Sequence, residues 1–244
     1  MCRTVADAAI MLQALVGYDP RDIASIRASV PDYSSALQRA TSSMRLGVPR
    51  DLFFEDVDAE ILDAVERALV VLSELTGSTR DIELPALPQA RPVLVESYAY
   101  HAEYLETSPE LYDAATREQI LRGRGIPATE YAESLYQVEL SRKAIDAVFD
   151  DVDLLITPTM ARMPVDIDTA LASAVEINPS LIRNASPFNT YGVPTISVPC
   201  GFSSDGLPIG LQIAGRHLRE IDVLALAHAY EQATEWHETV PPVS

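Results

Sequence analysis

The sequence predicts an α/β fold in which helices flank a mixed β-sheet. Short apolar runs alternate with longer segments of helical apolar spacing, and this alternation is typical of layered α/β proteins. The last two apolar runs stand on either side of Asp205-Gly206, a dipeptide favoured in tight hairpin turns. A hairpin adds antiparallel strands to a sheet whose other connections run through helices, so we expect a mixed sheet. The chain has no internal repeat, low-complexity tract or convincing linker, which predicts one packed unit.

The first predicted element is a helix that begins near Thr4. Thr4 and Asp7 form a capping pair, with Asp in place of the more usual Glu or Gln, and Gly17 ends the helix. Its apolar stripe, which must pack against another part of the protein, consists of Val5, Ala8, Ala9, Leu12, Leu15 and Val16. Residues 18–43 are polar and predict a connecting segment, whereas residues 45–49 predict a short strand that runs into a turn.

A second helix follows, with Asp58 as its predicted N-cap and Gly77 at its end. Its inward face is formed by apolar residues at helical spacing, namely Ile61, Val65, Ala68, Leu72 and Leu75. Residues 79–85 alternate apolar and polar side chains and therefore predict a strand. The stretch from about residue 90 to residue 122 predicts a helix-loop-helix segment.

A long helix is predicted to begin at Thr129 and to lead into a buried strand at residues 153–157. One face of this helix carries Tyr131, Leu135, Val138, Ile145 and Val148. Residues 195–198 and 207–213 are the predicted strands of the hairpin. The last helix is predicted over residues 220–234, with an inward face formed by Leu224, Ala227 and Tyr230.

Charge and cysteine usage narrow the function classes. The chain has 244 residues and a formal net charge of −18, which disfavours nucleic acid and anionic membrane surfaces as partners. No apolar run approaches the roughly 20 residues needed to cross a bilayer, and no basic segment followed by an apolar one indicates a signal peptide. Cys2 and Cys200 are too few for a disulfide framework. We therefore expect a cytoplasmic protein.

The sequence contains no recognisable pattern of a catalytic nucleophile, a base or metal ligands. No Gly-x-Ser-x-Gly occurs, and the serine pairs lie in polar segments, so we interpret them as solvated loop residues. The four histidines form no metal-ligand cluster, and His228 is interpreted as a packing or surface residue. Lys143, the only lysine, is expected on a solvated helix face and paired with Glu139. Residues 146–153 are acidic and predict a helix end and loop, while Cys200 is expected to be a buried thiol at a strand end.

The most distinctive segments lie near the end of the chain. Residues 189–202 read Asn-Thr-Tyr-Gly-Val-Pro-Thr-Ile-Ser-Val-Pro-Cys-Gly-Phe, and residues 206–215 read Gly-Leu-Pro-Ile-Gly-Leu-Gln-Ile-Ala-Gly. Both segments resemble the C-terminal part of the amidase signature family. Earlier segments also resemble stretches of that family and occur in the same order along the chain, among them residues 3–7, 46–49 and 153–159. The resemblance therefore covers essentially the whole chain.

This resemblance implies a large mixed sheet wrapped by helices and an amide-cleaving activity that needs no cofactor or metal. Members of the family use a serine nucleophile, a second serine in a cis peptide and a lysine base, all within an N-terminal region rich in glycine and serine. That region has no counterpart here, and the scarcity of glycine and lysine agrees with its absence. We therefore expect residues 1–244 to form a single incomplete domain, the C-terminal portion of an amidase, which is inactive alone.

By the same resemblance, two loops are predicted to border the pocket that binds a small-molecule amide substrate. Thr157, Pro158 and Thr159 leave the end of a predicted strand, where α/β proteins place binding loops. Asn189 and Pro194 precede a second strand. The alternative interpretation is that Asn and Pro at these positions only set tight turn geometry.

Other functions stay open on the sequence alone. The family includes the glutamine-hydrolysing subunit of a tRNA-dependent amidotransferase, but those subunits tend to carry Arg-Arg-Ile-x-Leu-Gly where residues 118–123 read Glu-Gln-Ile-Leu-Arg-Gly. This difference favours a general amidase. A second hypothesis is a non-catalytic interaction protein that retains the fold fragment, and a third is a remnant without a role. Because half a sheet exposes apolar edges, we expect the isolated chain to self-associate unless a partner chain completes it.

Overall fold

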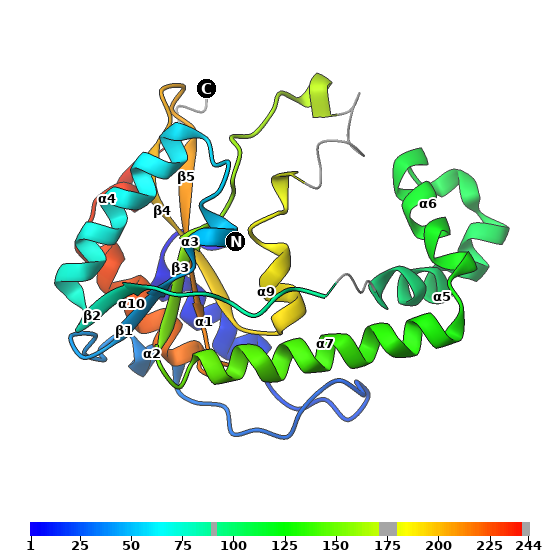
Figure 1. The fold of residues 1–244 in the computed structure, drawn as a ribbon, viewed down its shortest axis with the longest axis horizontal. Coiled ribbons are helices and arrows are strands. Elements are labelled where there is room, and N and C mark those ends of the chain that lie inside the picture. The colour runs from blue at the N-terminus through cyan, green and yellow to red at the C-terminus, as the bar shows by residue number, and fades with distance from the viewer. Residues whose placement is uncertain (89–91, 171–179, 241–244) are drawn as a thin grey trace.

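The centre of the protein is a mixed sheet of five strands. The computed structural model describes residues 1–88, 92–170 and 180–240, and its strand order is β2-β1-β3-β5-β4 (Figure 1). β1 is parallel to β2 and β3, whereas β5 is antiparallel to β3 and β4. The strands are β1 (Arg45–Val48), β2 (Ser78–Asp81), β3 (Leu154–Pro158), β4 (Thr195–Phe202) and β5 (Pro208–Gly215). The predicted mixed sheet is confirmed, although β2 is shorter than the strand expected at residues 79–85.

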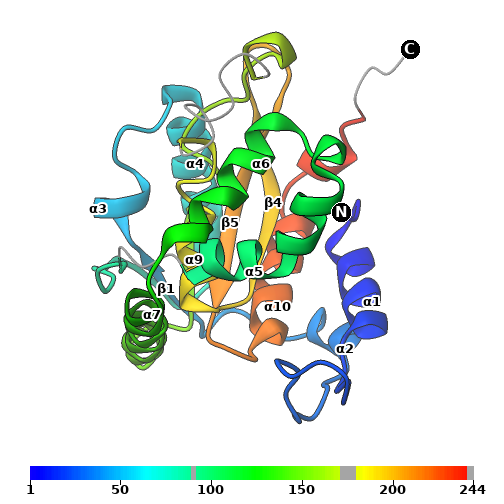
Figure 2. The ribbon, with the colours of Figure 1, turned by 90° about the vertical axis from the view of Figure 1, so that its right-hand side faces the viewer.

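Helices cover both faces of this sheet (Figures 1 and 2). Helices α4 and α10 pack on one face, and α9 packs on the other together with the C-terminal part of α7. The α-helices are α1 (Val5–Leu15), α2 (Tyr33–Ala36), α3 (Arg50–Phe53), α4 (Ala59–Leu75), α5 (Pro92–Thr107), α6 (Ala114–Leu121), α7 (Ala128–Val148), α9 (Ser186–Tyr191) and α10 (Glu220–Gln232). The 3₁₀ turns are η1 (Pro109–Leu111), η2 (Arg122–Gly125) and η3 (Trp236–Glu238).

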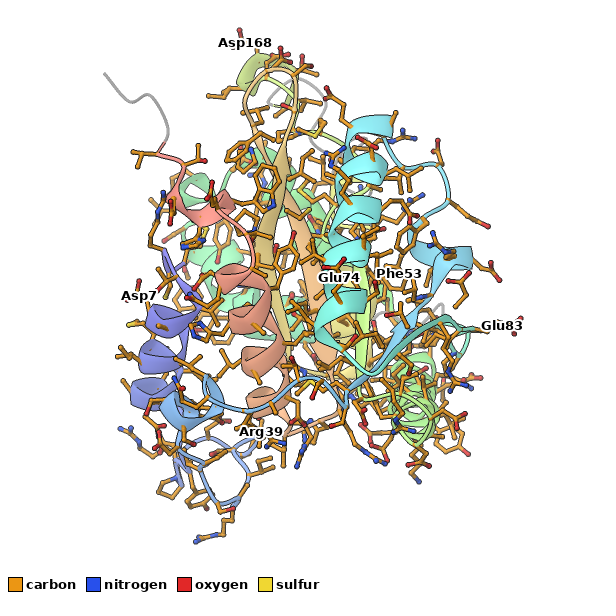
Figure 3. All side chains as sticks on the ribbon, turned by 90° about the vertical axis from the view of Figure 1, so that its left-hand side faces the viewer. Asp7, Arg39, Phe53, Glu74, Glu83 and Asp168 are labelled. Atoms are coloured by element: carbon orange, nitrogen blue, oxygen red, sulfur yellow. The ribbon has the colours of Figure 1, made fainter. Side chains whose placement is uncertain are left out.

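The alternation of side chains along β3 produces two apolar cores. Leu154 and Ile156 join the core beneath α4 and α10, whereas Leu155 joins the core beneath α7 and α9. In the second core the rings of Phe53 and Phe188 stack with their centroids 5.2 Å apart. Figure 3 shows the side chains that fill the space between the sheet and its helices. All five residues of β3 are buried, as a strand covered on both faces requires.

The N-terminal helix docks on the last helix of the chain. The predicted capping box of Thr4 and Asp7 is present at the start of α1. The backbone N–H of Val5 donates to Oε2 of Glu231 in α10 at 2.8 Å, in a buried position. The polar segment after α1, predicted only to connect elements, contains α2, whose Tyr33 and Ala36 are buried against the same helices. The sequence does not reveal this short helix because two apolar positions do not make a periodic pattern.

Asp58 occupies the N-cap position of α4 but does not cap the helix as predicted. Its side chain makes no hydrogen bond to the backbone of the first turn. The carboxylate instead accepts from the backbone N–H of Met163 at 2.7 Å and from Nη1 of Arg162 at 2.9 Å. The carboxylate binds these distant partners rather than the N–H groups of its own helix because a charged guanidinium and a backbone donor lie within its reach on the loop after β3. Asp58 therefore ties α4 to that loop.

Helices α5 and α6 form a helical arm that lies at the far end of α7 from the sheet (Figures 1 and 2). The arm packs mainly within itself, against η2 and against α7, and none of the described residues of α5 is buried. The predicted apolar face of α7 is correct only for its C-terminal half, where Val138 and Ile145 are buried. Leu135 is exposed because the N-terminal half of α7 extends beyond the sheet and has no strand to pack against.

The C-terminal elements follow the sequence pattern closely. Gly206 has a φ of +77°, as the hairpin turn demands, and the N–H of Ser203 donates to the carbonyl of Leu207 at 2.9 Å across the turn. The inward face of α10 is confirmed, since its predicted residues Leu224, Ala227 and Tyr230 are buried. In the described part of the chain, every helix is too short or too polar to span a bilayer.

Candidate functional site

The C-terminal end of β3 carries polar side chains on the face that α9 covers. Side chains alternate along the strand, so Thr157 follows Leu155 onto this face. Thr157 is fully buried, and its Oγ1 has no hydrogen-bond partner among the described residues. A buried hydroxyl without a partner costs free energy, which is why such atoms draw attention to a site.

Two buried amide side chains belong to the same end of the sheet as this hydroxyl. Gln212 in β5 lies opposite Thr157 in the ladder and is 4% exposed. Asn184, on the segment before α9, is fully buried and donates from Nδ2 to the carbonyl of Phe53 at 3.0 Å and to that of Pro158 at 3.1 Å. Nε2 of Gln212 in turn donates to the carbonyl of Asn184 at 3.4 Å. We call Thr157, Asn184 and Gln212 the amide cluster, and it fixes the end of β3 against α3.

A pair of hydroxyl groups lies beside the amide cluster, closer to solvent. Oγ1 of Thr159 and Oγ of Ser197 are 2.7 Å apart and share a hydrogen bond. The bond passes over Gly210, where a Cβ atom would stand 2.7 Å from the Ser197 oxygen and 2.8 Å from the Thr159 oxygen. Ser197 is exposed and Thr159 is half-buried. This Thr159–Ser197 hydroxyl pair offers a hydrogen-bond donor and acceptor at the open surface of the sheet.

The structure brings two of the predicted site residues together and separates the others. Thr157 and Pro158 lie side by side at the C-terminal end of β3, and both are buried. Pro194 lies at the other end of the sheet, because its carbonyl accepts from the N–H of Gly215, which pairs with Leu154 at the start of β3. Asn189 is exposed on α9.

The amide cluster and the hydroxyl pair include residues that the sequence analysis missed. Ser197 and Gln212 lie within predicted strands, so a search for polar residues in apolar strands finds them, whereas Thr159 belongs to the loop already predicted to border the pocket. Asn184 lies in a stretch without periodicity, and no local pattern marks it.

Among the described residues, nucleophiles and metal ligands are poorly placed for chemistry. Cys200 is buried as predicted, and burial raises the pKa of its thiol to about 12, so the thiolate is scarce at neutral pH. Lys143 is exposed on α7 as expected, but its predicted pair with Glu139 is wrong, since Glu139 binds Nη1 of Arg142 at 2.8 Å. Nowhere in the described ranges do three or more His, Cys, Asp or Glu residues come together as metal ligands.

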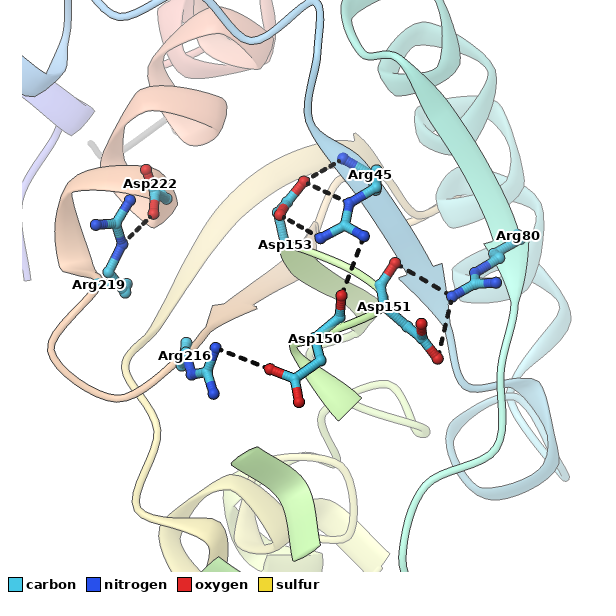
Figure 4. A network of polar contacts seen from close by, with 8 residues as sticks. All are labelled: Arg45, Arg80, Asp150, Asp151, Asp153, Arg216, Arg219 and Asp222. Atoms are coloured by element: carbon cyan, nitrogen blue, oxygen red, sulfur yellow. Dashed lines mark hydrogen bonds and ion pairs between the residues drawn. The ribbon is translucent and has the colours of Figure 1, made fainter. Parts of the chain in front are cut away.

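The acidic stretch before β3 is neutralised by arginines at the opposite end of the sheet (Figure 4). Asp153 accepts from Nη2 of Arg45 at 2.9 Å, from its Nε at 3.2 Å and from its backbone N–H at 2.7 Å. These hydrogen bonds hold the pKa of Asp153 below its usual value. Asp151 approaches Arg80 at 3.7 Å, and Asp150 lies 3.2 Å from Nη1 of Arg216. The network joins the starts of β1 and β3 to the end of β5, and it is a structural feature.

Comparison with known proteins places this fold and these residues in a family. The family model described as Amidase matches residues 1–224. An amidase of Pseudomonas putida is 37% identical over 249 residues, which cover 98% of this chain and 53% of that protein. A glutamyl-tRNA(Gln) amidotransferase subunit of Microcystis aeruginosa is 32% identical over 98% of this chain and 55% of its own length. The chain thus spans about half the length of the curated relatives it matches.

Solved structures give the same result. A bacterial aryl acylamidase of the amidase signature enzymes superimposes with a TM-score of 0.78 at 28% identity, covering 96% of this chain and 52% of that one. The 6-aminohexanoate cyclic dimer hydrolase superimposes with a TM-score of 0.82 at 22% identity, over 99% of this chain and 55% of the other, and supports the fold alone. From its family match, its relatives and its five-stranded mixed sheet, the chain belongs to the amidase signature family.

Proposed function

We propose that the chain is the C-terminal portion of an enzyme that cleaves carbon–nitrogen bonds of small-molecule amides. In this role the chain supplies a wall of the acyl site. The serine nucleophile, the second serine and the lysine come from a polypeptide that corresponds to the part of the relatives outside the matched region. The observation that carries this proposal is the Thr159–Ser197 hydroxyl pair, whose Ser197 is exposed to solvent, in a chain that spans about half the length of its relatives. The nearby amide cluster holds that surface rigid.

The four site residues predicted from the sequence take different parts in this proposal. Thr157 and Pro158 are buried, so they shape the wall from within while Thr159 and Ser197 face the substrate. Asn189 is exposed on α9 and is available to contact a substrate or the completing polypeptide. Pro194 directly precedes β4, level with the start of β3, where its role is to set the turn before the strand.

Ammonia release tests the proposal directly. The chain is produced alone and together with the portion of the Pseudomonas putida amidase that it does not match. We expect no hydrolysis of simple aliphatic and aromatic amides by the chain alone, and measurable ammonia release by the combination. In the combination, Ser197→Ala should raise KM several-fold, whereas Ser73→Ala, an exposed serine on α4 that bonds within its own helix, should leave KM unchanged. Hydrolysis by the isolated chain contradicts the proposal.

A second candidate function is favoured by the relatives themselves. Several of them are glutamyl-tRNA(Gln) amidotransferase subunits at about one-third identity. In that case the completed protein would hydrolyse glutamine rather than simple amides and would work in a complex. Residues 118–123 favour the general amidase, and glutaminase activity of the combination above simple amide hydrolysis would reverse that ranking.

The remaining proposals concern surroundings and partners. A net charge of −18 supports the absence of nucleic-acid or membrane partners, and the two cysteines are both free, which supports a reducing cytoplasmic location. We infer that the relevant partner is polypeptide that completes the sheet, with self-association as the alternative when that polypeptide is missing.

A further inference from the structure

The segment that joins α3 to α4 receives hydrogen bonds from the loop that follows β3. The backbone N–H of Asp58 donates to the carbonyl of Ala161 at 2.9 Å. The Asp58 carboxylate accepts from the backbone N–H of Met163 at 2.7 Å and from Nη1 of Arg162 at 2.9 Å. One residue of the segment therefore holds three consecutive residues of the loop, through its backbone and its side chain together.

Arg162 strengthens this contact from the side of the loop. Its guanidinium also forms an ion pair with Asp56, so one cation bridges two carboxylates of the segment. Asp56 has a φ of +47°, a left-handed conformation that non-glycine residues adopt uncommonly and that surrounding contacts must hold. The arginine that the segment binds thus also fixes the shape of the segment.

Two further loops at this end of the sheet bond to the same part of the chain. Nη2 of Arg183, on the segment before α9, donates to the carbonyl of Glu55. The backbone N–H of Ser204, in the turn between β4 and β5, donates to Oε1 of Glu60 at 2.9 Å. Residues 55–60 are therefore a common support for three loops, and α4 behind them makes this support rigid.

Thr159 lies between this support and strand β5. Its backbone N–H donates to the carbonyl of Gly210 at 3.0 Å, and the loop beyond it is bound to Asp58 two residues later. The side chain of a residue turns with its carbonyl about the N–Cα bond, so an anchor on the following residues also fixes the direction of the side chain. In Thr159 this direction brings Oγ1 to 2.7 Å from Oγ of Ser197.

We propose that Asp58 is a positioning residue for the amide substrate, because it holds the loop after β3 so that the Thr159 hydroxyl faces the acyl site. This rests on the proposed function, in which Thr159 and Ser197 face the substrate. Asp58 itself does not touch the substrate and acts through Thr159. Its carboxylate binds no N–H of the helix whose N-cap position it occupies, so its hydrogen bonds serve the loop rather than the helix.

Hydrogen exchange on the chain alone tests the loop contact without relying on activity. In Asp58→Ala the amide of Met163 loses its acceptor, and we expect it to exchange at least about 10-fold faster than in the unsubstituted chain. In Asp58→Asn the side-chain oxygen can still accept this bond, so part of the protection should remain. The amide of Thr159, which bonds to Gly210, should stay protected in both variants. Unchanged exchange at Met163 in Asp58→Ala would overturn the proposal.

Kinetics of the combination with the unmatched portion of the Pseudomonas putida amidase test the effect on the substrate. Asp58→Ala keeps the backbone bond to Ala161, about which the loop can then pivot. We therefore expect KM to rise several-fold with kcat nearly unchanged, and Asp58→Asn to recover part of the loss. Asp113→Asn, the same change at the N-cap of α6 in the helical arm, is the matched control and should leave both constants unchanged. A fall in kcat with KM unchanged in Asp58→Ala would contradict the positioning role.

A double variant separates positioning from a general loss of stability. Thr159→Val removes the hydroxyl and keeps the shape of the side chain, so in its presence Asp58→Ala should raise KM no further. Additive increases in KM would show that Asp58 does not act through Thr159. If Asp58→Ala fails to fold, as circular dichroism would reveal, Asp58→Asn takes its place in every comparison.

The two proposals fail separately. No amide hydrolysis by the combination contradicts the proposed function and removes the substrate from the role of Asp58, and the exchange of Met163 then decides whether Asp58 holds the loop. Amide hydrolysis with an unchanged KM in Asp58→Ala contradicts the positioning role alone.

Discussion

Replacement of Asn184 by alanine tests whether the amide cluster holds the end of β3 in place. The change removes two buried hydrogen bonds, to the carbonyls of Phe53 and Pro158, and leaves both acceptors without that donor. Each lost bond costs about 1 kcal/mol, and a buried polar group without a partner adds to the loss. We therefore expect the free energy of unfolding to fall by about 3 kcal/mol, which corresponds to about 6–12 °C in Tm for a chain of this size.

Urea unfolding followed by circular dichroism measures this loss. Asn189→Ala is the matched control, because Asn189 is an exposed asparagine on α9, five residues along the chain. The control should change the free energy of unfolding by less than about 0.5 kcal/mol. A loss below about 1 kcal/mol for Asn184→Ala, or equal losses for both variants, would show that the amide cluster does not anchor the strand.

Three further predictions follow from buried or paired groups. A thiol reagent should label Cys2 rapidly and Cys200 only after denaturation, since burial raises the pKa of Cys200 to about 12; two fast thiols would contradict this. Asp153→Asn should cost about 1 kcal/mol at neutral pH and Asp151→Asn almost nothing, as equilibrium unfolding would show. Because Arg45 lowers the pKa of Asp153, its contribution exists above pH ~4 and disappears as pH falls through the lowered pKa, so Asp153→Asn should flatten the acid limb of a stability–pH curve. Gly210→Ala should cost about 1–3 kcal/mol, because the new Cβ displaces the hydroxyl pair, and an unchanged Tm would refute that reasoning.

The strands and long helices are predictable because their signals are local. A short continuous apolar run identifies the buried strand β3, and Asp205-Gly206 identifies the hairpin that β4 and β5 form. The capping box of α1 depends on residues three positions apart, so it too can be found in the sequence. The amidase resemblance depends on contiguous segments and is equally accessible.

The errors concern partners that are distant in sequence. Asp58 is predicted to cap its own helix, but its hydrogen bonds go to residues 105 and 104 positions away, which no local pattern contains. Asn184 escapes sequence analysis because it acts through the carbonyls of Phe53 and Pro158, also from other elements. The exposure of Leu135 depends on where α7 leaves the sheet, and helical periodicity cannot distinguish a core from open space.

The helical arm divides the molecule into regions of unequal cooperativity. α7 has 21 residues, a length of about 31 Å, and its buried side chains all lie from its midpoint onward. Unfolding of α5, α6 and the first half of α7 therefore exposes little apolar surface, whereas unfolding of the sheet exposes both cores. We therefore expect the arm to open locally at a smaller free energy than the sheet. A ligand or chain that orders it must offset that conformational freedom before gaining affinity.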